Sequence, residues 1–265
     1  MSTSNKLIEK YKRLTVVQKE LKAEIAFRKK AESNKDELIT IAGHELKTPL
    51  TIIKGYLHLL ENSSSEKLIE NTRMYIARTL VQIDKLELLV TDLLDTSKIE
   101  TGNLSLIRQT VDFDLLVQTV IESFRLVHPT HLIGLTGKCR SNICGDKIRL
   151  EQVIINYLTN AIKYSPDSVK IEVTVSEKAG VIEFSVQDSG IGISADKQAL
   201  LFHKFYRVED PTHRFHGLGM GLYISAEIIH HHNGEVGVIS EKGKGSVFYF
   251  RLPVLATVKS RVLQR

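Results

Sequence analysis

Residues 151–166 read EQVIINYLTNAIKYSP, and this stretch decides which kind of domain the second half of the chain forms. Apolar residues recur in it at the spacing of one helix face. Asp146 precedes the stretch as a residue type that caps helices, and Pro166 follows where a helix cannot continue. The sequence therefore predicts a helix that starts after Asp146 and ends near Tyr164.

Three polar residues form a stripe along this helix. Asn156, Asn160 and Lys163 are spaced at i, i+4 and i+7, so they share one face. Amide oxygens suit a magnesium ion, and a lysine suits the phosphates that such an ion carries. A solvent-exposed polar face without a ligand is the alternative interpretation.

The segments around this helix mix strands with helices but lack a regular βαβ alternation. The predicted elements are a helix from Asp112 to Val127, strands at 132–136, 141–144, 169–176 and 181–188, helices from Ser194 towards Phe205 and from Leu218 to His232, and strands at 235–241 and 246–253. This order favours an α+β sandwich, with one sheet and helices on one of its faces.

The strand that ends at Asp188 leads into the sequence DSGIGI, residues 188–193. The carboxylate of Asp188 can accept a hydrogen bond from an exocyclic amine. Gly190 and Gly192 allow the backbone to approach a flat base closely. An ordinary turn explains the same residues.

A second glycine-rich stretch, GLGMGL at residues 217–222, opens the helix that follows. Glycines at a helix start expose amide groups that can bind phosphate oxygens. The stretch lacks the Lys-Ser/Thr pair of a P-loop and the βαβ setting of a dinucleotide fingerprint. Close helix packing is the alternative explanation.

The first 103 residues predict long helices. Apolar residues at heptad-like spacing cover residues 38–60 and 76–97, with a turn at 62–65 between them. Gly102 is placed to terminate the second helix. A two-helix hairpin cannot bury its own apolar stripe, so we expect it to pair with a second copy as a dimeric four-helix bundle.

The first hairpin helix contains HELKTPL, residues 44–50. Pro49 cannot donate to the carbonyl of Glu45, so the helix is expected to bend beside His44. Leu46 and Leu50 continue the core stripe, which leaves His44 towards solvent. A neutral imidazole nitrogen can attack an electrophile, and a neighbouring carboxylate can accept its proton. An ordinary surface histidine is the alternative.

Composition excludes several classes of protein. The net charge of +5 comes from residues 1–35, where ten Lys/Arg and four Asp/Glu give +6; the remaining 26 Lys/Arg and 27 Asp/Glu give −1. The basic excess is therefore a solvated helix face rather than a nucleic-acid site. The longest apolar-or-glycine run, residues 217–224, is too short for a membrane span. Two cysteines fit a reducing, cytoplasmic compartment.

Taken together with one further motif, the four motifs described above resemble those of the sensor histidine kinases of two-component signalling. A phosphoacceptor box, an asparagine box, an aspartate-glycine box, a phenylalanine box (LFHKFYR, 201–207) and a second glycine box occur in the family's order. The resemblance runs from about Asp36 to Pro253. It implies an ATP-binding domain like those of gyrase and chaperone ATPases.

The resemblance implies roles for the first motif. His44 matches the autophosphorylated histidine, and Glu45 matches its acid/base neighbour. Thr48 matches the polar residue linked in this family to dephosphorylation of the partner. That partner is the receiver domain of a response regulator, whose aspartate accepts the phosphoryl group.

The same resemblance assigns the ATP site. Asn160 matches the Mg²⁺ ligand, and Asn156 and Lys163 match residues near the metal and phosphates. Tyr164 and Asp188 match residues that line the adenine pocket.

The glycine-rich motifs complete that site. Gly190 and Gly192 match glycines that shape the adenine pocket, and Arg207 matches a basic residue that reaches the γ-phosphate. The backbone that closes over the phosphates is matched by Gly217, Leu218 and Gly219. Many members of the family have a small hydroxyl residue where this chain has Leu218.

The chain is thus expected to be a homodimeric, cytoplasmic ATP-dependent histidine kinase whose upstream sensor is missing. Its parts would be a coiled-coil signalling helix at 1–34, a dimerisation and phosphotransfer domain at 35–103, a catalytic domain at 104–256 and a tail at 257–265. Two other classes stay open: a non-enzymatic adaptor with a structural ATP site, and an ATP-hydrolysing clamp of the gyrase type.

Overall fold

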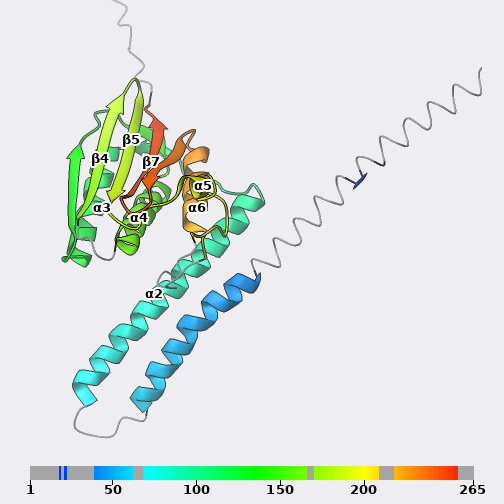
Figure 1. Ribbon diagram of the computed structural model, residues 1–265, viewed down its shortest axis with the longest axis vertical. Coiled ribbons are helices and arrows are strands. Elements are labelled where there is room, and N and C mark those ends of the chain that lie inside the picture. The colour runs from blue at the N-terminus through cyan, green and yellow to red at the C-terminus, as the bar shows by residue number, and fades with distance from the viewer. Residues whose placement is uncertain are drawn as a thin grey trace, which may run out of the picture. The chain divides into compact units, whose positions relative to one another are not determined.

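The computed structural model describes most of the chain in two compact units, Met1–Leu89 and Val90–Arg265 (Figure 1). The described residues are 18, 21–22, 39–61, 68–165, 170–208 and 218–255. The predicted 62–65 turn, Gly217, the 257–265 tail and almost all of the predicted coiled coil lie outside them. Within the described residues, no helix is both long and apolar enough to cross a membrane.

A helical hairpin makes up the described part of the first unit. Residues 39–61 form one helix, and the first part of α2 (Leu68–Glu100) forms the other. Between them, Tyr56 stacks on Tyr75 with ring centroids 5.7 Å apart, and Arg78 donates a 3.3 Å hydrogen bond to the Tyr56 hydroxyl. The hairpin predicted from the heptad-like spacing is confirmed.

A second apolar face of the hairpin is exposed in the single chain. Its side chains have exposed fractions of 38–54%: Leu50, Leu57, Ile76, Leu80 and Ile83. Large apolar side chains in such a row usually pack against another element. The exposed row is the face that the predicted four-helix bundle would bury.

A five-stranded mixed sheet forms the base of the second unit (Figure 1). Its strands, in spatial order, are β2 (Leu132–Gly137), β4 (Lys170–Lys178), β5 (Val181–Asp188), β7 (Gly245–Pro253) and β6 (Glu235–Glu241). β2 and β4 are parallel, and all other neighbours are antiparallel. Asp188 is the last residue of the central strand β5, so it lies where that strand leaves the sheet.

Three helices pack on the sheet: α3 (Phe113–Val127) on β2, α4 (Lys147–Tyr164) on β5 and α6 (Gly221–His231) on β7. Alternate strand residues such as Phe184 and Phe250 are fully buried beneath them, and their rings meet Phe113 edge-on. The predicted caps are confirmed: Asp112 accepts from Leu115 N–H, and Asp146 accepts from the backbone N–H groups of the first turn of α4. The α+β sandwich is confirmed.

Some predicted boundaries were wrong. The helix expected from Ser194 to Phe205 is only α5 (Ala195–Gln198); Ser194 makes no side-chain cap, and Phe205 has a φ of +63°, which no continuing α-helix allows. α6 begins at Gly221 instead of Leu218 because Gly219 is left-handed, with φ +70°. The strand predicted at 141–144 is β3 (Ile143–Gly145), and it pairs with β1 (Gln109–Val111), which the sequence did not predict.

Candidate functional site

His44 is exposed on the first hairpin helix. It lines a shallow groove together with Lys47, Thr48, Thr51 and Ile52. The helix continues through Pro49, which is buried, and the Thr48 hydroxyl lies 3.4 Å from the His44 carbonyl oxygen, to which it donates. The imidazole is therefore accessible to a reactant, as its spacing from the apolar stripe predicted.

In the second unit, a chain of hydrogen bonds links α4 to α6. Asn160 Nδ2 donates to Asn156 Oδ1 over 3.2 Å, and Asn156 Nδ2 donates to Ser225 Oγ over 2.9 Å. Ser225 is only 2% exposed. Both amide nitrogens donate within this series of hydrogen bonds. The Oδ1 of Asn160 lies at the end of the series, where it can accept from a hydrogen-bond donor or bind a metal ion.

Asp188 lies at the end of β5 and is 5% exposed. Burial raises the pKa of its carboxyl group above the usual range, and hydrogen bonds from the backbone N–H groups of Gly190 and Ser246 partly oppose this. The Gly190 bond is 2.8 Å long. A buried carboxylate held by backbone donors is a fixed acceptor for a polar group of a ligand.

The aspartate-glycine motif packs tightly against the end of α4. Ile191 N–H donates to the Tyr164 carbonyl oxygen over 3.3 Å. A Cβ on Gly190 would lie 2.1 Å from that same oxygen, so a side chain there would force the two segments apart. Glycine is therefore required at this position by a close backbone approach.

The second glycine motif lies beside the asparagine helix and the phenylalanine motif. A Cβ on Gly221 would meet Asn156 Oδ1 at 2.6 Å, and a Cβ on Gly219 would meet Arg207 Cγ at 3.0 Å. Leu218 is buried, with 4% exposure, and Gly217 lies outside the described residues. The tertiary structure therefore brings together the asparagine, aspartate-glycine and second glycine motifs.

The donor set fits magnesium better than a transition metal. Among the described residues, no group of three or more His, Cys, Asp or Glu side chains could hold a metal ion. The Oδ1 of Asn160 is a neutral, hard oxygen, which suits an Mg²⁺ ion whose other ligands are phosphates and water. The ammonium of Lys163 lies on the same helix face, 5.0 Å from the centre of the Tyr164 ring.

Sequence reasoning missed two residues of this site, Gly221 and Ser225. They lie four residues apart on α6, so both face Asn156: the glycine leaves space, and the serine accepts its hydrogen bond. The spacing of Gly221 and Ser225 at i and i+4 could have indicated that they share one face of the helix. Only the packing of α6 on α4 shows what they contact.

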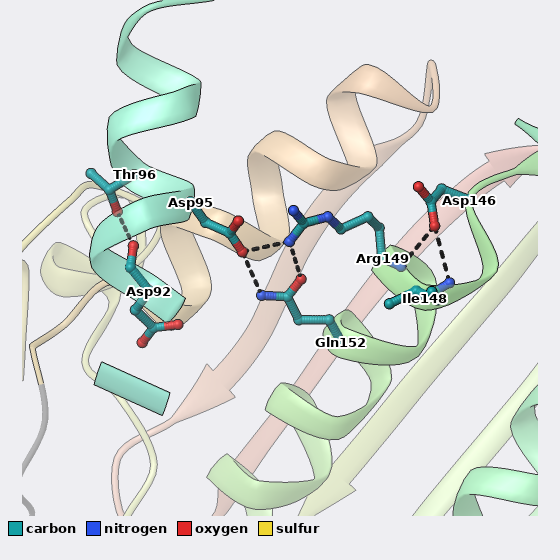
Figure 2. Close-up of polar contacts among 7 residues, drawn as sticks. All are labelled: Asp92, Asp95, Thr96, Asp146, Ile148, Arg149 and Gln152. Atoms are coloured by element: carbon teal, nitrogen blue, oxygen red, sulfur yellow. Dashed lines mark hydrogen bonds and ion pairs between the residues drawn. The ribbon is translucent and has the colours of Figure 1, made fainter. Parts of the chain in front are cut away.

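The last turns of α2 are bonded to the first turns of α4 within the second unit (Figure 2). Asp95 is 2% exposed and accepts from Arg149 Nη1 at 2.5 Å and from Gln152 Nε2 at 3.0 Å. Arg149 also donates to Gln152 Oε1. A buried carboxylate is thus matched by a cation and an amide.

Asp92 lies one turn before Asp95, and its backbone carbonyl oxygen accepts a 2.8 Å hydrogen bond from the Thr96 hydroxyl (Figure 2). Burial, together with the negative charge of Asp95, raises the pKa of Asp92 from 3.8 to about 6. The folded state therefore binds the Asp92 proton more tightly than the unfolded state does. Asp92 stabilises the fold most below pH 3.8, and this contribution is lost as the pH rises through about 6.

We expect Asp92→Asn to stabilise the second unit at pH 7.5, because it removes a buried charge. A shift of this size corresponds to at most about 3 kcal/mol, and we expect about 1–2 kcal/mol after relaxation. Urea unfolding of the full chain between pH 4 and 7.5 measures it, and the variant should have the flatter pH dependence. Asp84→Asn, at an exposed position of the same helix, should change little. Equal effects of the two substitutions would contradict the prediction.

Two family descriptions match the sequence. Residues 34–102 match the His Kinase A (phospho-acceptor) domain, and residues 145–256 match the histidine kinase-, DNA gyrase B- and HSP90-like ATPase. The first match contains His44, and the second contains the asparagine, aspartate-glycine and second glycine motifs. The chain therefore has a phosphoacceptor region followed by an ATPase-type domain.

Similar curated proteins are sensor kinases. The sensor protein kinase WalK of Staphylococcus saprophyticus is 31% identical over 236 residues, and the sensor histidine kinase WalK of Bacillus subtilis is 28% identical over 235. Each alignment covers 87% of this chain but only 38% of the relative. This chain therefore spans well under half the length of the curated relatives that it matches.

Solved histidine kinases share the fold. Full-length ShkA, solved in complex with AMPPNP, has a TM-score of 0.59 and 28% identity, covering 83% of this chain and 46% of that one. AdeS of Acinetobacter baumannii has a TM-score of 0.59 and 25% identity, covering 80% of this chain and 98% of that one. With both domains, their order and their motifs in place, the chain belongs to the sensor histidine kinases of two-component signalling.

Proposed function

We propose that this chain is an ATP-dependent autokinase that phosphorylates His44. The observation that carries the proposal is that the candidate nucleophile and the candidate nucleotide-binding residues lie in different units. An exposed histidine followed by a carboxylate lies on the helical hairpin. In the second unit, α4 contacts the aspartate-glycine motif at Tyr164 and the start of α6 at Asn156, which supports a nucleotide site there. A nucleophile and a nucleotide site on separate units suit transfer of a phosphoryl group between them.

The residues of the hairpin carry the chemical step. A ring nitrogen of His44 attacks the γ-phosphorus of ATP, the bond from that phosphorus to the β–γ bridging oxygen breaks, and ADP leaves. The proton on the other ring nitrogen passes to the Glu45 carboxylate. Catalysis comes mainly from positioning and from neutralising phosphate charge.

The residues of the second unit hold the nucleotide. Asp188 accepts from the adenine amine, Tyr164 lines the adenine pocket, and Gly190 and Gly192 shape it. Asn160 would hold an Mg²⁺ ion, which would neutralise the charge of the phosphate oxygens when bound. The remaining phosphate contacts are assigned to Asn156, Lys163, Arg207 and the backbone of Gly217, Leu218 and Gly219.

The partners follow from the family and from the exposed hairpin face. The phosphoryl group of His44 passes to an aspartate on the receiver domain of a response regulator, and Thr48 serves the reverse dephosphorylation. A second copy of the chain covers the apolar row that includes Leu57 and Leu80.

Incubation of the chain with γ-labelled ATP and magnesium chloride tests the proposal. We expect a protein-bound label that is labile in acid and stable in base, as a phosphoramidate is. An adaptor would bind nucleotide without becoming labelled. A gyrase-type clamp would release inorganic phosphate with no label on the protein, so either result would contradict the proposal.

Asp188→Asn should weaken the binding of ATP about tenfold to a hundredfold. Replacing one oxygen of a buried carboxylate by an NH₂ group removes a charged acceptor, which is worth about 1.5–3 kcal/mol. Calorimetric titration with AMPPNP measures the affinity. Asp196→Asn, at an exposed position on α5, is the matched control and should bind like the unmodified chain. An unchanged affinity of Asp188→Asn would refute the assignment of the adenine pocket.

A further inference from the structure

Ser225 is a buried polar residue that no step of the proposed mechanism uses. It lies on α6, one turn after Gly221, and its Oγ accepts a 2.9 Å hydrogen bond from Asn156 Nδ2. It is 2% exposed, so water does not readily replace this bond. A hydroxyl in such a position fixes the amide that it contacts.

The amide of Asn156 is held on both sides. Ser225 accepts from its nitrogen, and its oxygen accepts from Asn160 Nδ2 over 3.2 Å. Gly221 leaves the space that this oxygen occupies, since a Cβ there would lie 2.6 Å from it. The orientation of Asn156 therefore follows from two residues of α6.

The orientation of Asn160 follows in turn. Because its Nδ2 donates to Asn156, its Oδ1 must point away from Asn156, towards the open end of the chain of bonds. Partners that orient a metal ligand commonly change metal affinity tenfold or more when they are removed. The direction of the Asn160 oxygen thus depends on Ser225 of α6, which is two hydrogen bonds away.

We infer that Ser225 is a positioning residue for the magnesium ligand Asn160, acting through Asn156. This rests on the proposed function, and it adds a residue and a route to it. The serine and Gly221 belong to the helix that the second glycine motif opens. The packing of α6 on α4 therefore orients the proposed metal ligand Asn160, and the same helix carries the end of the second glycine motif.

The test measures nucleotide binding rather than activity. AMPPNP is titrated calorimetrically into the full chain, once with saturating magnesium chloride and once with EDTA, and the ratio of the two affinities is the magnesium-dependent gain. We expect Ser225→Ala to reduce this gain about tenfold. The affinity in EDTA should fall by much less, through the looser phosphate contact of Asn156 alone.

Two further variants separate positioning from packing. Ser225→Cys keeps the volume but offers a poor acceptor, so it should lose the gain as Ser225→Ala does. Ser123→Ala makes the same change on α3, where the exposed hydroxyl bonds only to its own helix, and should keep the gain. Thermal unfolding of each variant in EDTA shows that it is folded.

Three results would overturn the inference. The magnesium-dependent gain could survive in Ser225→Ala, the affinities in magnesium and in EDTA could fall equally, or Ser225→Cys could keep the full gain. If the unmodified chain bound AMPPNP with no magnesium-dependent gain, the metal role of Asn160 would fail first. If it bound no nucleotide at all, the proposed function itself would fail.

Discussion

His44→Gln is expected to abolish the acid-labile label completely. Glutamine preserves the size and polarity of the side chain but offers no nucleophilic ring nitrogen. The residues assigned to ATP binding all lie in the second unit, so the variant should bind AMPPNP with unchanged affinity. Autophosphorylation with γ-labelled ATP, followed by acid and base treatment, measures the loss.

His58→Gln is the matched control. His58 lies on the same helix, about four turns after His44, and its side chain is 59% exposed. It has no carboxylate directly after it in the sequence, so it should remain dispensable. Label retained in His44→Gln, or lost in His58→Gln, would move the acceptor and refute the central assignment.

Gly192→Ala is expected to lower the free energy of unfolding of the second unit by about 3 kcal/mol or more. Gly192 has a φ of +61°, which costs alanine about 1–2 kcal/mol. The added Cβ would also lie 1.9 Å from the Glu241 carbonyl oxygen, so the two segments must separate. Separation strains the bonds from Gly243 N–H to Ile191 O and from Ile193 N–H to Ser240 Oγ, each worth about 1 kcal/mol.

Gly243→Ala isolates the close approach from the backbone cost. Gly243 has a φ of +81°, but a Cβ there would meet no atom within 4 Å. It should therefore lose only about 1 kcal/mol in the same urea unfolding experiment. If both substitutions cost the same, the contact with Glu241 carries no energy and the prediction is wrong.

Much of the fold was predictable because it depends on local rules. Asp112 and Asp146 cap helices through their own side chains, and alternation along residues 181–188 gives a strand with one buried face. The failures came where neighbours in space decide. Phe205 takes a left-handed backbone that its own residue type does not favour, and β1 pairs with β3, which lies far from it in the sequence.

The residues of the candidate site also fall into two groups, those predicted from the sequence and those seen only in the structure. Asn156, Asn160, Asp188 and His44 were predicted from the sequence, because the chemistry of a residue and its place in a motif are properties of the sequence. Ser225 was missed, since its partner lies 69 positions away along the chain. The partial burial of Asp92 was missed because burial depends on the tertiary packing around a residue.

The sequence by itself determined the family, the order of the motifs and which side chains can act as nucleophile, acceptor or metal ligand. Tertiary structure alone decided which of them meet: α6 against α4 places Ser225 on Asn156, and the end of α4 places the Tyr164 carbonyl oxygen against Gly190. The physical reason is the distance along the chain over which each kind of interaction acts. Capping, periodicity and turn preferences act over a few residues, whereas burial, hydrogen-bond pairing and the space that a missing Cβ leaves depend on chain segments that only folding brings together.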